Sequence, residues 1–194
     1  MREEYIIAAK EACAYVYKIC PLGSANRCNG IGPGTRESAE SALIREKSDF
    51  DQQVKAILAV SEHSAQEKYL SIIRLLADVA QKAKAGNCQE MAAVAFLFLM
   101  EQGIAPIEMV CVPTHTFVVI GRDPELDIDD PGCWNQETVI CDPWRRGDYL
   151  TMNAFFKKES MIYPPQELLD CGHKYLHVGL GIYKPVINSS PRAS

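Results

Sequence analysis

The amino-acid sequence predicts an α+β fold in which helices come first and an antiparallel sheet follows. Up to Gly103 the apolar residues recur at steps of three or four, which is typical of helices, and beyond it they alternate, which is typical of strands. The strand segments follow one another closely in the chain, which favours antiparallel pairing. We therefore expect helices packed on a sheet.

The helical part is expected to contain five helices, the first of which ends before Pro21. The fourth helix has the clearest apolar stripe, and the fifth is apolar on nearly every side, which predicts a helix packed all round. Gly103 is suited to end that helix in a left-handed conformation. A loop rich in glycine and proline covers 21–35. The expected helices cover residues 3–20, from Thr35 through Leu43, 50–61, 69–80 and 88–102.

The sheet is expected to contain four strands, of which the last alternates most cleanly. They cover residues 107–112, 115–120, 137–141 and 174–183. With 194 residues, the chain suits a single domain, 1–194. We divide that domain into a helical lobe, 1–80, and a catalytic core, 80–185.

Composition limits the classes of function. The chain is 47% hydrophobic and carries a net charge of −5 with no basic stripe, so nucleic acid is not the expected partner. No apolar run is long enough to span a membrane, and acidic residues near Met1 argue against a cleaved signal peptide. We expect eight mostly free thiols and folding in the cytoplasm. The sequence is also compatible with delivery into a host cell by a route that needs no cleaved signal.

Three residues occur in the order that a thiol catalyst needs: Cys88, His115 and Asp142, separated by two intervals of 27 residues. Cys88 opens the apolar helix, where unpaired N–H groups favour a thiolate and can hold an oxyanion. His115 opens a strand, and its side chain is expected to share a face with Phe117 and Val119 that points toward the buried helix. Asp142 closes the next strand. The three predict a nucleophile, a base and an orienting carboxylate.

Each of these residues taken alone is more often structural. A cysteine at a helix start is usually a small packing residue, a histidine in a strand is usually a satisfied core residue, and aspartate before proline commonly caps a turn. Their coincidence in this order, each at the end of an element, favours the catalytic interpretation.

The surrounding residues strengthen this interpretation. Gly86-Asn87-Cys88 opens the helix, Glu101-Gln-Gly-Ile-Ala-Pro106 ends it, and His115-Thr-Phe-Val-Val119 and Val139-Ile-Cys-Asp-Pro-Trp144 follow. Over about residues 80–150 the chain resembles the catalytic core of the transglutaminase-like superfamily, which is related to papain-like thiol enzymes. The resemblance implies a Cys88 nucleophile, a His115 base and an Asp142 orienter. A thiol core joined to a helical lobe that matches no family also resembles small bacterial effector proteins.

The chain departs from these families in two respects. Papain-like peptidases carry a glutamine shortly before the nucleophile, whereas the nearest one here, Gln81, lies seven residues upstream. Transglutaminases often use a tryptophan remote from the nucleophile, and the sequence assigns that role to neither Trp134 nor Trp144. The second oxyanion donor is therefore unassigned.

Other possible sites are weaker. Cys171, His173 and His177 have zinc-ligand spacing but no fourth ligand, and the acidic run 122–132 lacks the EF-hand order. We interpret that run as a solvated loop. We expect no cofactor and no metal.

These observations predict a thiol enzyme that acts on protein amides through a Cys88 thioester, by glutamine deamidation or transamidation. A cysteine protease with the same triad and a non-catalytic binding module that retains the fold are the alternatives. The nucleophile turn also resembles that of arylamine N-acetyltransferases, but the Asp142-Pro143-Trp144 context fits them less well. The expected partner is a protein substrate, a host protein included, and residues 1–80 are expected to recognise it.

Overall fold

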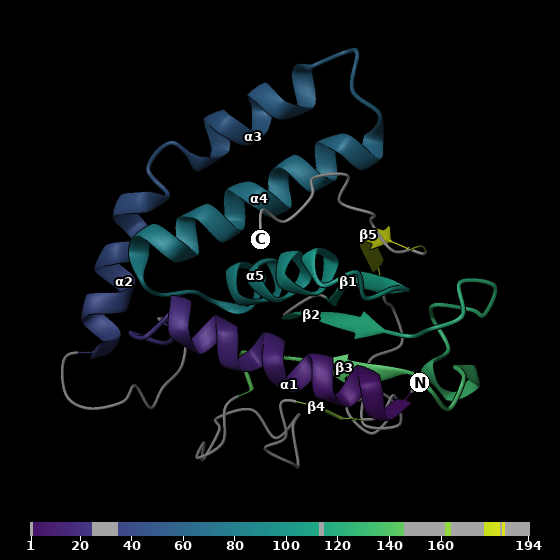
Figure 1. Cartoon of the computed structure of the whole chain (residues 1–194). Coiled ribbons are helices and arrows are strands. Elements are labelled where there is room, and N and C mark those ends of the chain that lie inside the picture. Colours follow the sequence, from purple (N-terminus) through teal and green to yellow (C-terminus); the bar gives the residue numbers. More distant parts are fainter. Residues whose placement is uncertain are drawn as a thin grey trace, which may run out of the picture.

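The computed structural model describes residues 2–24, 35–112, 115–145, 162–163, 177–182 and 184. Its helices are α1 (Arg2–Ile19), α2 (Thr35–Glu46), α3 (Phe50–Ala59), α4 (Ala65–Ala83) and α5 (Cys88–Glu101), with a short 3₁₀ helix, η1 (Pro131–Cys133). In Figure 1, α5 lies at the centre, α1 crosses on one side of it, and α3 and α4 form a hairpin on the other.

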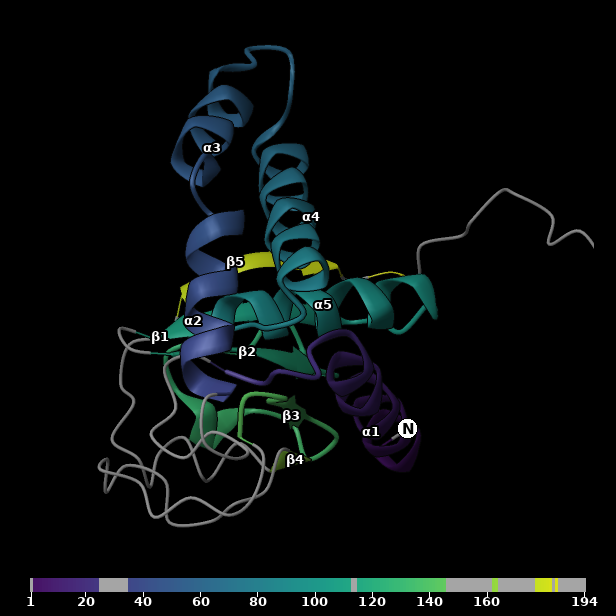
Figure 2. The same cartoon turned by 90° about the vertical axis from the view of Figure 1, so that its left-hand side faces the viewer.

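The strands form one antiparallel sheet in the order β4-β3-β2-β1-β5. They are β1 (Ile107–Val112), β2 (His115–Ile120), β3 (Val139–Cys141), β4 (Ile162–Tyr163) and β5 (His177–Ile182). Figure 2 shows α2, α3 and α4 rising from one side of this sheet. The α+β class expected from the sequence is confirmed.

The expected helices and strands are present, with changed ends and one addition. The fourth helix begins at Ala65, before its apolar stripe, because Ser64 and Glu67 form a capping box at its N-terminus. The third strand begins later, because the Thr138 N–H donates to the Asn135 carbonyl in a turn. β4 was not expected, since a two-residue strand carries no measurable alternation.

The sheet has two different faces. One face packs with α1, α4 and α5 in the main core, to which Val16, Leu76, Phe96, Val118 and Cys141 belong. Residues from both sides of position 80 therefore share one core, and α1 is as much a part of it as α5. The opposite face carries a second cluster in which Trp134 packs with strand residues Val110, Val112, Phe117, Val119 and Ile140.

Helix α5 is enclosed, as its composition predicts: Glu90 to Phe96 and Leu99 are all buried. Its end is a Schellman motif. The N–H groups of Gly103 and Ile104 donate to the carbonyls of Met100 and Leu99, with Gly103 at φ +72°.

Helices α2 and α3 pack less closely. Helix α2 contributes Ala39, Ala42 and Leu43 to a third cluster with the last turns of α4, whereas α3 buries none of its side chains. No helix in the described part of the chain is long and apolar enough to cross a bilayer.

Candidate active site

The nucleophile turn joins α4 to α5 and is held by backbone pairing with the segment after α1. The Leu22 N–H donates to the Lys84 carbonyl at 2.9 Å, and the Gly86 N–H donates to the Gly23 carbonyl at 3.0 Å. Asn87 is the N-cap residue of α5, in an extended conformation, and Cys88 is the first helical residue. The half-buried Cys88 thiol is thereby placed beside unpaired N–H groups of the first turn.

Two features make this turn specific. The Glu90 carboxylate Oε2 accepts the Asn87 backbone N–H at 2.8 Å, which anchors the residue before the nucleophile. A Cβ atom at Gly86 would lie 3.1 Å from Met91 Cγ and 3.2 Å from Glu90 Cβ, tighter than ordinary contact. Glycine at 86 therefore allows the turn to pack directly on the helix that follows.

The register of the sheet brings His115 and Asp142 together. Val118 pairs with Cys141 in an antiparallel ladder, so the next residue, Asp142, lies opposite Phe117. Asp142 is therefore the diagonal neighbour of His115 on the same face of the sheet. His115 Nε2 and Asp142 Oδ2 are 2.6 Å apart, and both side chains are buried. Because a carboxylate only accepts, Nε2 carries the hydrogen of this bond.

His115 also lies close enough to Cys88 for that side chain to act on the pKa of the ring. Asp142 occupies Nε2, so Nδ1 is the ring nitrogen left for a second partner. Burial lowers the pKa of His115, but the charge and hydrogen bond of Asp142, together with the Cys88 sulfur, more than offset it and raise the pKa to about 9. The imidazolium is therefore the dominant form at neutral pH.

One sequence expectation about His115 is wrong. Its ring does share a face with Phe117, at 5.9 Å between centroids, but that face carries Phe117 and Val119 into the second cluster and not toward α5. The main core with α5 uses Val118 and Ile120 instead. His115 is the first residue of its strand, so it lies at the end of the sheet, where the Cys88 side chain acts on its pKa.

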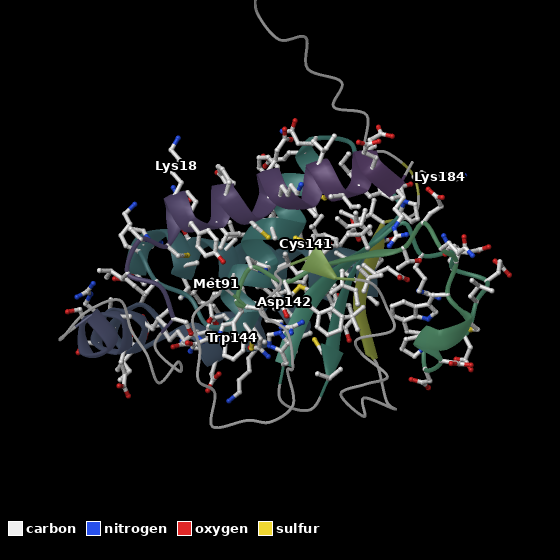
Figure 3. All side chains as sticks on the ribbon, turned by 90° about the horizontal axis from the view of Figure 1, so that it is seen from below. Lys18, Met91, Cys141, Asp142, Trp144 and Lys184 are labelled. Atoms are coloured by element: carbon white, nitrogen blue, oxygen red, sulfur yellow. The ribbon has the colours of Figure 1, made fainter. Side chains whose placement is uncertain are left out.

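Trp144 belongs to the site although the sequence assigned it no role. Its indole packs on the His115 ring at 4.9 Å between centroids, and Figure 3 shows it with Asp142 just beyond the end of β3. The indole N–H donates to Ser24 Oγ at 3.0 Å, and Ser24 Oγ–H donates to Asn87 Oδ1 at 3.2 Å. These bonds join the His115 side of the site to the nucleophile turn.

Ser24 had no sequence signal, because it lies 64 residues before Cys88 in a loop segment. Gln81 is exposed on α4, so the nearest upstream glutamine is not a buried part of the site. Trp134 lies in the second cluster. The N–H groups at the start of α5 are the oxyanion donors that this geometry offers.

The other described thiols have different surroundings. Burial and the nearby Glu90 charge raise the pKa of Cys20 to about 12, and a hydrogen bond with Cys13 and burial raise the pKa of Cys141 well above its usual value. Cys13 and Cys141 lie 3.7 Å apart between sulfurs, packed between α1 and β3. Cys20 and Cys141 therefore carry little thiolate at neutral pH.

The alternative sites give no support to a metal. Cys171, His173 and the side chain of His177 lie outside the described residues. In the acidic loop, Asp123, Asp127 and Asp130 accept backbone N–H groups of the loop itself, and Arg122 is buried in an ion pair with Glu108. Within the described ranges, no group of three or more His, Cys, Asp or Glu residues is placed to hold a metal ion.

Comparison with protein-family models, with curated proteins and with solved structures finds no match to this chain. The chemical interpretation of the site therefore depends on its geometry. A half-buried thiol at a helix start, a buried imidazolium beside it and a carboxylate on the far ring nitrogen can support nucleophilic attack on an acyl carbon.

Proposed function

We propose that the chain is a thiol-dependent acyl-transfer enzyme that acts on protein amides, with the glutamine side chain as the favoured substrate. The observation that carries the proposal is the buried His115–Asp142 hydrogen bond, with Cys88 acting on the same imidazole ring. The thiol supplies the nucleophile, and the charged imidazole supplies the proton that the leaving group needs.

The proposed reaction has two halves. The Cys88 thiolate attacks the carboxamide carbon, and the oxyanion forms near the N–H groups at the start of α5. His115 gives its proton to the departing ammonia, which leaves a thioester on Cys88. Water or an amine then attacks the thioester, and His115 takes a proton from the attacking molecule. The Cys88 thiolate is released together with a carboxylic acid, when water attacks, or a new amide, when an amine attacks.

Asp142 and Trp144 hold the base in this scheme. Asp142 fixes the tautomer and stabilises the charged ring. Trp144 packs on the ring, and its indole N–H is engaged with Ser24. Peptide-bond hydrolysis uses the same groups. The two reactions differ in the leaving group, which is ammonia from a glutamine side chain and the amine end of the cleaved peptide in hydrolysis.

The test is mass spectrometry of a cell lysate treated with the wild-type chain or with Cys88→Ala, and Cys133→Ala serves as the control because Cys133 is exposed and lies in η1, outside the triad. Conversion of glutamine to glutamate, or a glutamine cross-link, by wild type and Cys133→Ala alone would support the proposal. Cleaved peptides would indicate a protease. Identical lysates with all three proteins would indicate a binding module. A host-cell lysate is the first choice, because a host protein is among the substrates expected from the sequence.

A further inference from the structure

A buried ion pair connects the helical lobe to the nucleophile turn. Glu90, in the first turn of α5, is fully buried, and its Oε2 accepts the Asn87 N–H. Lys47 Nζ lies 2.5 Å from Glu90 Oε1, and the two groups form an ion pair. A buried carboxylate is costly unless its charge is compensated.

Lys47 is placed for this contact by the helical lobe. It lies in the turn between α2 and α3, where its backbone N–H donates to Leu43, and its ammonium lies 5.7 Å from the centre of the Phe50 ring. Leu43 belongs to the cluster that packs α2 against the end of α4, and Phe50 packs against that cluster as well as the main core. The position of Lys47 therefore depends on the docking of α2.

We infer that Lys47 is a positioning residue for the proposed acyl transfer, and that it acts by neutralising Glu90 beside the nucleophile. Glu90 anchors Asn87 through one oxygen, but its negative charge opposes a thiolate two residues earlier. With Lys47 on the other oxygen, the anchor remains and the charge is cancelled. This inference rests on the proposed function, because it concerns the thiolate of Cys88.

Other charged groups near Glu90 are few among the described residues. Glu90 and Lys84 both act on the Cys20 thiol just after α1, with opposite sign. Lys84 is exposed, whereas the Lys47 side chain is only 33% exposed. Lys47 is therefore the less screened of the two cations.

The experiment measures the rate of Cys88 alkylation by iodoacetamide as a function of pH. Lys47→Met should move the midpoint of the profile upward by about half a pH unit or more, as expected for one uncompensated buried charge nearby. Lys47→Arg should keep the wild-type profile, and Lys47→Met combined with Glu90→Gln should return the midpoint toward it. Lys82→Met is the matched control, because Lys82 forms an exposed ion pair with Asp78 and should leave the profile unchanged.

The outcomes separate this inference from the proposed function. If wild-type Cys88 reacts no faster than the exposed Cys133, the proposed function fails. If wild-type Cys88 is fast but Lys47→Met has the wild-type midpoint, only the inference fails, even when thermal stability falls. A double variant that keeps the shifted midpoint also overturns it. Should Lys47→Met not fold, Glu90→Gln decides: a midpoint at or below that of wild type supports the inference, and one above it contradicts it.

Discussion

The His115 ring is subject to two opposing effects. Burial disfavours its charged form, whereas the Asp142 carboxylate at 2.6 Å and the Cys88 sulfur favour it, and together they raise the pKa to about 9. In the proposed reaction the ring is therefore suited to give a proton to the leaving group.

At the residue scale, Cys88 should be the fastest of the described thiols to react with limiting iodoacetamide near neutral pH. Cys20 and Cys141 should react slowly, because both are buried and their raised pKa values keep them protonated. Peptide mapping after brief labelling measures the order. The exposed Cys133 controls for access, and equal labelling of Cys88 and Cys133 would contradict the assignment of the nucleophile.

The raised pKa of His115 also predicts how stability varies with pH. A group whose pKa is higher in the folded state stabilises the fold fully below its unfolded pKa, here near 6.5, and this contribution is lost as pH rises through about 9. For this shift the contribution is on the order of 3 kcal/mol. The free energy of unfolding should therefore fall between these pH values in wild type.

Asp142→Asn is the variant that tests this expectation, because the amide keeps the shape of the side chain and removes the charge that stabilises the ring. The difference in unfolding free energy between wild type and Asp142→Asn, measured in urea, should be largest near pH 6 and smaller above pH 9. A difference that stays constant with pH would mean that the ring and the carboxylate are not coupled.

At the scale of elements, four segments form the site. The segment after α1 pairs with the turn before α5, and Asp142, the residue after β3, lies beside the first residue of β2. The bonds from Trp144 through Ser24 to Asn87 close this arrangement on the side of the nucleophile. The orientation of the thiol relative to the imidazole therefore depends on how these elements pack.

Ser24→Ala should reveal this dependence. The change removes two hydrogen bonds, worth about 1 kcal/mol each, and leaves the indole N–H of Trp144 without its partner on Ser24. We expect Cys88 alkylation to slow several-fold, with a small loss of thermal stability. Ser71→Ala is the control, since the Ser71 hydroxyl donates to the Glu67 carbonyl within α4. Equal alkylation rates in the two variants would show that the Ser24 bonds do not orient the site.

At the scale of the whole molecule, the helices before α5 differ in their relation to the site. Helix α1 and helix α4 are built into the main core, and residues such as Val16 and Leu76 are buried there. Helices α2 and α3 carry the exposed apolar side chains Ile44 and Leu58, at 66% and 51% exposure. Exposed apolar side chains also lie on α1 (Ile7 and Tyr15) and on α4 (Tyr69). Because α2 and α3 contribute least to the main core, we take them as the first candidates for contact with a protein substrate.

We expect Ile44→Gln and Leu58→Gln to impair turnover of the true protein substrate while Cys88 alkylation stays at the wild-type rate. The side chains are exposed, so the loss of stability should be below about 0.5 kcal/mol. Val16→Ala is the contrasting variant: it opens a cavity in the main core and should lower the free energy of unfolding by roughly 1–3 kcal/mol. If the two exposed variants keep both substrate turnover and Cys88 alkylation at the wild-type rate, substrate recognition lies in another part of the chain.

The sequence alone determined the fold class, the five helices, the principal strands and the three residues of the candidate triad. These depend on local periodicity, on glycine and proline at element ends, and on residue types that each carry their own chemistry. The enclosed α5 and its end at Gly103 were predicted for the same reason.

Only the tertiary structure decided which residues meet. The alternation of β2 side chains between two faces was visible in the sequence. Which face packs on α5 depends on how β2 pairs with β1 and β3, and the expectation for His115 was wrong on this point. Ser24 and Lys47 reach the site from distant segments through side-chain contacts, and Trp144 is joined to the nucleophile turn through Ser24. Such contacts leave no period in the sequence, because they are set by how the helices and the sheet pack together.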